Sequence, residues 1–114
     1  MTRSRTIQFV FTEAAARAIT EQAEYYSERQ SQSLAERWDN LVRRTILSLR
    51  KMPQRGAPCH FGHSELKDLR RISVAGFPHL IFYRYFPERA VIQIVHVLHG
   101  ARDIEAVLLR RQES

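Results

Sequence analysis

The sequence contains little cysteine and lysine and no long apolar run. Cys59 is the only cysteine, which excludes an intrachain disulfide and makes a reducing, cytoplasmic location the simplest expectation. No stretch of about 18 apolar residues is present, so no membrane-spanning helix is expected, and no signal peptide is evident at the N-terminus. The 114 residues, 44% of them hydrophobic, predict one folded domain over residues 1–114, with its core at about 6–109.

The positive charge is large and unevenly placed. Lys and Arg number 18 against 12 Asp and Glu, and all but Lys51 and Lys67 are arginine. Residues 1–40 are nearly balanced, whereas residues 41–114 hold thirteen basic and six acidic side chains. Arginine pairs bidentately with carboxylates and phosphates. A solvated basic surface explains this composition as well as an acidic partner does, whether nucleic acid or an acidic protein chain.

The N-terminal half predicts a strand followed by two helices. Alternating apolar residues indicate a strand at 6–11, and Thr12 is a suitable cap for a helix over 12–29. Ser33 and Glu36 fit a capping box that begins a second helix over 33–52, which Pro53 ends. Their apolar stripes predict an antiparallel helical hairpin, and Trp38 is expected in its core rather than as a base-stacking platform.

The C-terminal half predicts a loop, three strands and a short helix. Pro and Gly mark residues 53–64 as a loop, and strands are expected at 68–74, 79–86 and 90–98. A helix is expected over 103–110, with Ile104, Val107 and Leu108 on one face. The order β-α-α-β-β-β-α predicts an α+β domain in which an antiparallel sheet packs against the helical hairpin.

The segment Cys59-His60-Phe61-Gly62-His63 contains the side chains that zinc prefers. Only three ligands occur, two of them adjacent, and no second pair follows at a standard spacing. We therefore expect a polar loop and no metal. Neither a glycine-rich phosphate loop nor a Ser/His/Asp nucleophile motif is visible, so no cofactor is expected.

Three pieces of the C-terminal half, in this order, resemble the RelE/ParE superfamily of type II toxins, and most closely its ParE, or plasmid-stabilisation, branch. They are Leu69-Arg70-Arg71-Ile72, Gly76-Phe77-Pro78-His79-Leu80-Ile81-Phe82-Tyr83-Arg84 and Val97-Leu98-His99-Gly100-Ala101-Arg102-Asp103. The order of predicted elements agrees over about residues 6–109. The resemblance implies a RelE/ParE-like fold and a bacterial toxin that a cognate antitoxin neutralises.

The resemblance implies two alternative targets. The ParE branch is associated with poisoning of DNA gyrase, and the RelE branch cleaves messenger RNA on the ribosome. Metal-free RNA cleavage needs a base, an acid and a cation for the phosphorane charge, and the candidates here are His79, Arg84, His99 and Arg102. This chain lacks an aromatic residue after Phe86, where the RelE branch carries one. His79 also replaces an arginine that is frequent in that branch.

We therefore expect a toxin that binds DNA gyrase rather than an enzyme, with a ribosome-dependent endonuclease and a basic nucleic-acid-binding module as the alternatives. An acidic antitoxin is the expected partner, docked in an apolar groove between the helices and the sheet. The residues expected to bind partners are the basic and C-terminal ones, namely Arg70, Arg71, Arg84, Arg102, Asp103, Ile104, Val107 and Leu108.

Structural roles are the simpler alternative for several of these residues. His79 follows Pro78 and would then only end a turn, and Tyr83 is more typical of a core than of a site. Arg102 and Asp103 would pair with each other or cap the last helix. The stripe of the last helix would pack on the domain itself.

Overall fold

The structure, a computed structural model, describes residues 6–100 and 103–112. Arg102, one of the candidate residues, lies outside the described residues. The helices are α1 (Glu13–Arg29), α2 (Gln32–Ser48) and α3 (Ile104–Gln112), with short 3-10 turns η1 (Ser64–Leu66) and η2 (Pro87–Arg89). The strands are β1 (Gln8–Phe11), β2 (Ala57–Pro58), β3 (Arg70–Ser73), β4 (His79–Phe86) and β5 (Val91–His99).

The five strands form one sheet in the order β1-β5-β4-β3-β2. The pairs among β2, β3, β4 and β5 are antiparallel, but β1 runs parallel to β5. The expected α+β class is confirmed, and the expectation of a purely antiparallel sheet is wrong. Thr12 ties the end of β1 to β5, since its N–H donates to the Ile94 carbonyl at 3.0 Å and its hydroxyl to the Val95 carbonyl at 2.7 Å.

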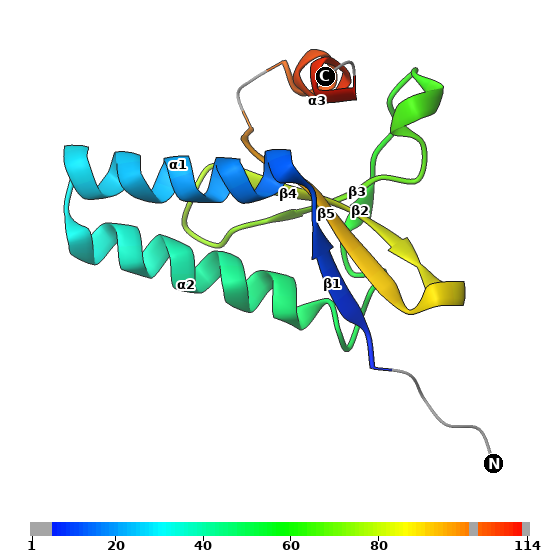
Figure 1. Cartoon of the computed structure of the whole chain (residues 1–114), viewed down its shortest axis with the longest axis horizontal. Coiled ribbons are helices and arrows are strands. Elements are labelled where there is room, and N and C mark those ends of the chain that lie inside the picture. The colour runs from blue at the N-terminus through cyan, green and yellow to red at the C-terminus, as the bar shows by residue number, and fades with distance from the viewer. Residues whose placement is uncertain (1–5, 101–102, 113–114) are drawn as a thin grey trace.

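The α1–α2 hairpin covers one face of the sheet (Figure 1). Trp38 is fully buried there, as expected, among aliphatic residues of β4 and β5 such as Ile81 and Ile94. The ring of Tyr26 meets Trp38 edge-on at a centroid distance of 6.1 Å. Apolar residues on the helices and on alternate strand positions thus build the larger core of the domain.

The opposite face of the sheet has a second core. Phe82 and Leu98 project from β4 and β5 toward Leu66, Leu69 and Leu108, which come from the segment before β3 and from α3. Figure 1 shows α3 lying apart from the hairpin. Because β4 is covered on both faces, three consecutive residues of it, Ile81, Phe82 and Tyr83, are fully buried.

The ends of α2 differ from the sequence prediction. Ser31, not Ser33, is the N-cap, and its hydroxyl accepts the N–H of Leu34 at 3.0 Å. The predicted capping box of Ser33 with Glu36 is therefore wrong. The helix ends at Ser48 rather than at Met52, and turns carry the chain on to Pro53. The predicted loop also contains β2, which pairs with β3.

Among the described residues, no helix is long and apolar enough to cross a bilayer.

Candidate partner-binding site

A cleft of about 800 Å³ lies between α1, α3 and the adjoining ends of β4 and β5. His79 opens β4 and His99 closes β5, and the antiparallel register places them opposite each other. Their ring centroids are 5.7 Å apart. The cleft is lined by Ala18, Glu21, Gln22, Tyr25, Tyr26, Pro78, His79, His96, Val97, Leu98, His99 and Val107.

His79 is held as a neutral side chain at the base of this cleft. It is buried, and its Nδ1 accepts the indole N–H of Trp38 at 3.3 Å. Burial lowers the pKa of His79, and the neighbouring His99 lowers it further. Since Nδ1 accepts a hydrogen bond, the proton of the neutral ring lies on Nε2. The Trp38–His79 bond therefore joins α2 to β4 and occupies the basic nitrogen of the His79 ring.

Arg84 lies five residues along β4 from His79 and does not reach the cleft. Its guanidinium donates to the carbonyls of Glu65 at 2.6 Å and Lys67 at 3.2 Å, and so fastens η1 to the sheet. Of the four residues considered for RNA cleavage, the structure brings together only His79 and His99. Arg102 lies outside the described residues, and Arg84 is committed to backbone carbonyls.

The predicted basic face is divided between the two faces of the sheet. Arg70 pairs in register with Tyr83, and Arg71 pairs with Phe82, so these neighbouring arginines project to opposite sides. Arg70 donates to the carbonyls of Gln54 at 3.2 Å and Gly56 at 2.7 Å. Arg71 is exposed on the side of Phe82 and is the candidate of this set best placed to meet a partner.

The candidate residues of α3 largely serve the domain itself. Leu108 is buried in the second core, where Ile104 and Val107 also pack. The Asp103 carboxylate accepts the N–H of Ala106 at 3.4 Å and caps the helix, which is the structural alternative for this residue. Val107 also lines the cleft, and it is the residue of this stripe placed to contact a bound partner.

The Cys59–His63 segment shows no metal-binding arrangement. No group of three or more His, Cys, Asp or Glu side chains that could hold a metal ion occurs in the described part of the chain. His63 instead caps η1, its Nδ1 accepting the N–H of Glu65 at 3.2 Å. Burial raises the pKa of the Cys59 thiol, although Arg71 acts in the opposite direction. The thiol is therefore protonated at neutral pH.

Two further surfaces were not predicted residue by residue. An apolar groove of about 270 Å³ runs between β1 and the helices, lined by Phe9, Phe11, Ile19, Asp39, Arg43, Ile46 and Leu47. Phe11 is 44% exposed and Leu47 52% exposed.

Tyr25 lines the cleft beside His79 and was not predicted as a site residue. The sequence does carry a signal for it, because Tyr25 follows no apolar stripe and stands next to Tyr26, which does. In the structure its side chain is 51% exposed.

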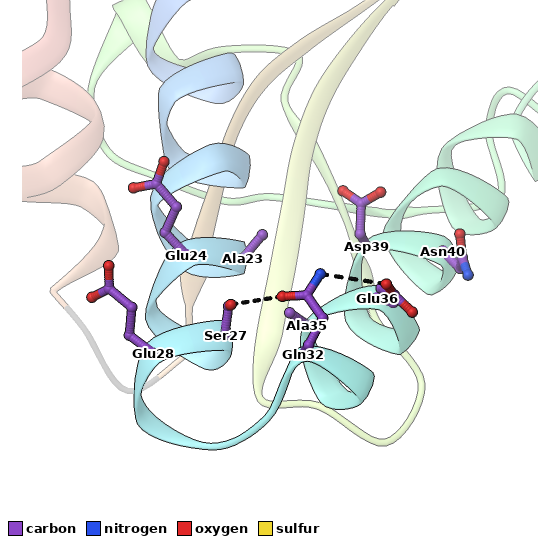
Figure 2. Close-up of a pocket in the computed structure, with 9 residues that line it drawn as sticks. All are labelled: Ala23, Glu24, Ser27, Glu28, Gln32, Ala35, Glu36, Asp39 and Asn40. Carbon is purple, nitrogen blue, oxygen red and sulfur yellow. Dashed lines mark hydrogen bonds between the residues drawn. The ribbon is translucent and has the colours of Figure 1, made fainter.

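The closed end of the hairpin is acidic. A cleft of about 530 Å³ lies between α1 and α2 there, flanked by Glu24 and Glu28 on one side and Glu36 and Asp39 on the other (Figure 2). Gln32 bridges the two helices, accepting the Ser27 hydroxyl at 2.7 Å. The excess positive charge of the chain therefore lies elsewhere.

Comparison with known families decides what kind of domain carries these surfaces. A model of the ParE toxin of the type II toxin–antitoxin system parDE matches residues 9–104. The chain belongs to the ParE toxin family. The resemblance seen in the sequence is thereby confirmed, and the chain is a type II toxin of the RelE/ParE superfamily. A comparison with curated protein sequences gives no match.

Solved structures agree on the fold of this ParE-family chain. The chromosomal ParDE system of P. aeruginosa matches with a TM-score of 0.68 and 16% identity, over 84% of this chain and 98% of that one. The RelBE2 toxin–antitoxin complex of Mycobacterium tuberculosis gives 0.57 and 19%, over 88% and 98%. The isolated E. coli RelE toxin gives 0.54 and 12%, over 95% and 99%. ParE and RelE toxins thus share this fold, and the fold does not choose between their targets.

Proposed function

We propose that this ParE-family toxin acts by binding DNA gyrase rather than by catalysis, and that an acidic antitoxin neutralises it. One observation supports binding rather than catalysis: two of the candidate catalytic side chains already form hydrogen bonds within the fold. His79 accepts a hydrogen bond from Trp38, and Arg84 binds two backbone carbonyls. The nitrogen of His79 that would take up a proton already accepts the Trp38 N–H, and the Arg84 guanidinium is directed at the loop carbonyls instead of the cleft, so neither is placed to act on a phosphodiester bound there.

The apolar groove between β1 and the helices supports an antitoxin partner. An amphipathic acidic segment can bury its apolar side against Phe11 and Leu47, which are exposed in the free domain. Toxin–antitoxin complexes with this fold, such as the ParDE system of P. aeruginosa, support the same assignment. The net charge of +6 favours rapid encounter with an acidic chain.

A ribosome-dependent endonuclease is the second candidate, because His79 and His99 do meet in a cleft. An assay with purified components distinguishes the two. Relaxed plasmid with gyrase and ribosomes loaded with message are each incubated with the parent protein and with His99→Ala. We expect supercoiling to be inhibited by both proteins to a similar extent and the message to stay intact.

The proposal would be contradicted by the following result. The parent cleaves message and leaves supercoiling by gyrase normal, and His99→Ala reduces the cleavage rate by the factor of about 10²–10⁴ that is typical of a lost acid or base. His79→Ala is included only after its fold has been verified by circular dichroism, because His79 supports Trp38.

Charge reversal at Arg71 tests the antitoxin part. Arg71→Glu should slow association with the cognate acidic antitoxin and flatten the dependence of the association rate on salt. Reversal at Arg84 is less informative because it also removes the contacts that hold η1. Equal association rates for Arg71→Glu and parent at low salt would exclude Arg71 from the interface.

A further inference from the structure

The chain has four exposed cations that line neither the cleft nor the apolar groove. Residues 40–64 contain four arginines, one lysine and no acidic residue. Arg44, Arg50, Lys51 and Arg55 are exposed, and they stand on the last turns of α2 and in the loop that follows. We call these four residues the cationic turn.

No carboxylate in the described part of the chain pairs with the cationic turn. Within residues 6–100 and 103–112, the ion pairs join Arg17 to Glu13 and Arg43 to Asp39, and none involves the four residues. Arg50 lies over the ring of Phe9 at 5.1 Å, and Arg55 donates to the Ser48 hydroxyl. Their positive charge therefore remains available to an external anion.

The backbone on either side of Arg55 is held by side chains of β3 and β4. The buried Tyr83 hydroxyl accepts the N–H of Gly56 at 2.8 Å and donates to the Pro53 carbonyl at 2.9 Å. Arg70 clamps the same loop from the other side, binding the carbonyls of Gln54 and Gly56. A Cβ added at Gly56 would lie 2.6 Å from the Tyr83 hydroxyl, so the close approach requires glycine. A buried tyrosine and an arginine thus hold the loop from which Arg55 projects.

A cluster of cations in a short stretch of chain suits a densely charged polymer. Arg44, Arg50, Lys51 and Arg55 fall within residues 44–55, which contain no acidic side chain. Duplex DNA carries about one negative charge per 1.7 Å of helix axis, so it can present phosphates to several of these cations at once.

We propose that the cationic turn binds the phosphate backbone of duplex DNA. The four cations stand outside the lining of the apolar groove in which the acidic antitoxin segment is proposed to bind, so they are left for a second polyanion. The contacts are to phosphates, so the binding is independent of base sequence. The proposal does not depend on gyrase as the target.

Fluorescence anisotropy of a labelled duplex of random sequence tests the proposal, with purified protein at several salt concentrations. We expect micromolar affinity in low salt and a slope of log affinity against log salt of about −3.6, from roughly 0.9 per neutralised phosphate. Changing Arg44, Arg50, Lys51 and Arg55 to Gln should abolish measurable binding. A triple variant that keeps Arg55 also keeps the hydrogen bond from Arg55 to Ser48, so losing that bond cannot cause a folding defect in it. This triple variant should retain a slope of about −0.9.

The matched control removes the same charge elsewhere. Changing the exposed Arg29, Arg37, Lys67 and Arg89 to Gln also takes four positive charges away, and it should leave most of the affinity and slope intact. Equal losses in the two quadruple variants would show that only net charge matters and would overturn the site. Stronger binding of poly-glutamate than of duplex by the cationic turn would assign it to an acidic protein instead. Gyrase inhibition measured on the same variants separates failure of this site from failure of the proposed function.

Discussion

The two faces of the sheet are covered in different ways. On the hairpin face, eleven buried residues pack together. Two polar groups are buried with them: His79 accepts the Trp38 N–H, and the Tyr83 hydroxyl accepts the Gly56 N–H. On the opposite face, six buried apolar residues pack beneath α3 and the segment before β3. The first core is built by two long helices with clear periodicity, whereas the second relies on short segments that have little structure of their own. The difference predicts unequal sensitivity to substitution.

Trp38→Ala should have the largest effect. Its side chain is fully buried in the hairpin-face core and also donates the hydrogen bond to His79. Removing a buried aromatic of this size costs about 3–5 kcal/mol of unfolding free energy. Urea unfolding of the parent and the variant measures the loss. An unchanged midpoint would show that Trp38 contributes nothing to this core.

Leu108→Ala should cost less, about 2–4 kcal/mol, because it opens a cavity in the smaller core that surrounding short segments can partly refill. Hydrogen exchange should show faster opening in η1 and α3, with the helical hairpin still protected. Leu109→Ala, a partly buried neighbour, is the matched control and should cost less than Leu108→Ala. Uniform loss of protection over both faces would contradict the separation of the two cores.

Tyr83→Phe should cost about 1–2 kcal/mol. The ring stays buried, but the Gly56 N–H and the Pro53 carbonyl lose the hydroxyl that joins them. Thermal unfolding gives the loss, and proteolysis should become faster at residues 53–56. A variant as stable and as protease-resistant as the parent would show that Arg70 alone suffices to hold the loop.

The pH dependence at His79 should be the smallest effect. Its folded-state pKa lies below the ordinary value of 6.5, so the unfolded chain takes up the proton more readily than the folded one. The stability from the neutral ring is fully present above about 6.5 and is lost as the pH falls through the lowered pKa. His79→Asn, whose side-chain oxygen can accept the Trp38 N–H, should therefore lose less stability than the parent between neutral and mildly acidic pH. Identical pH profiles would contradict the neutral state of His79.

The elements of this chain were more predictable than its sites. The strand over 79–86 and the start of α1 after Thr12 were correct, because alternation and capping act between neighbouring residues. The end of α2 was placed too late, since Pro53 limits a helix without requiring it to extend that far. Arg70 and Arg71 were expected on one basic face, but the strand period sends their two side chains to opposite faces of the sheet.

The sequence by itself determined the class of the domain, its helical hairpin, its burial of Trp38 and its likeness to ParE toxins, since these depend on local periodicity and on motifs in a fixed order. Only the tertiary structure decided that β1 runs parallel to β5, because side-chain alternation is the same for either strand direction. It also decided that Arg84 binds the Glu65 carbonyl in η1, that His79 accepts a hydrogen bond from the Trp38 N–H and that Tyr83 holds the loop at Gly56. Each of these bonds joins residues more than fifteen positions apart, and their pairing is set by how the whole chain packs.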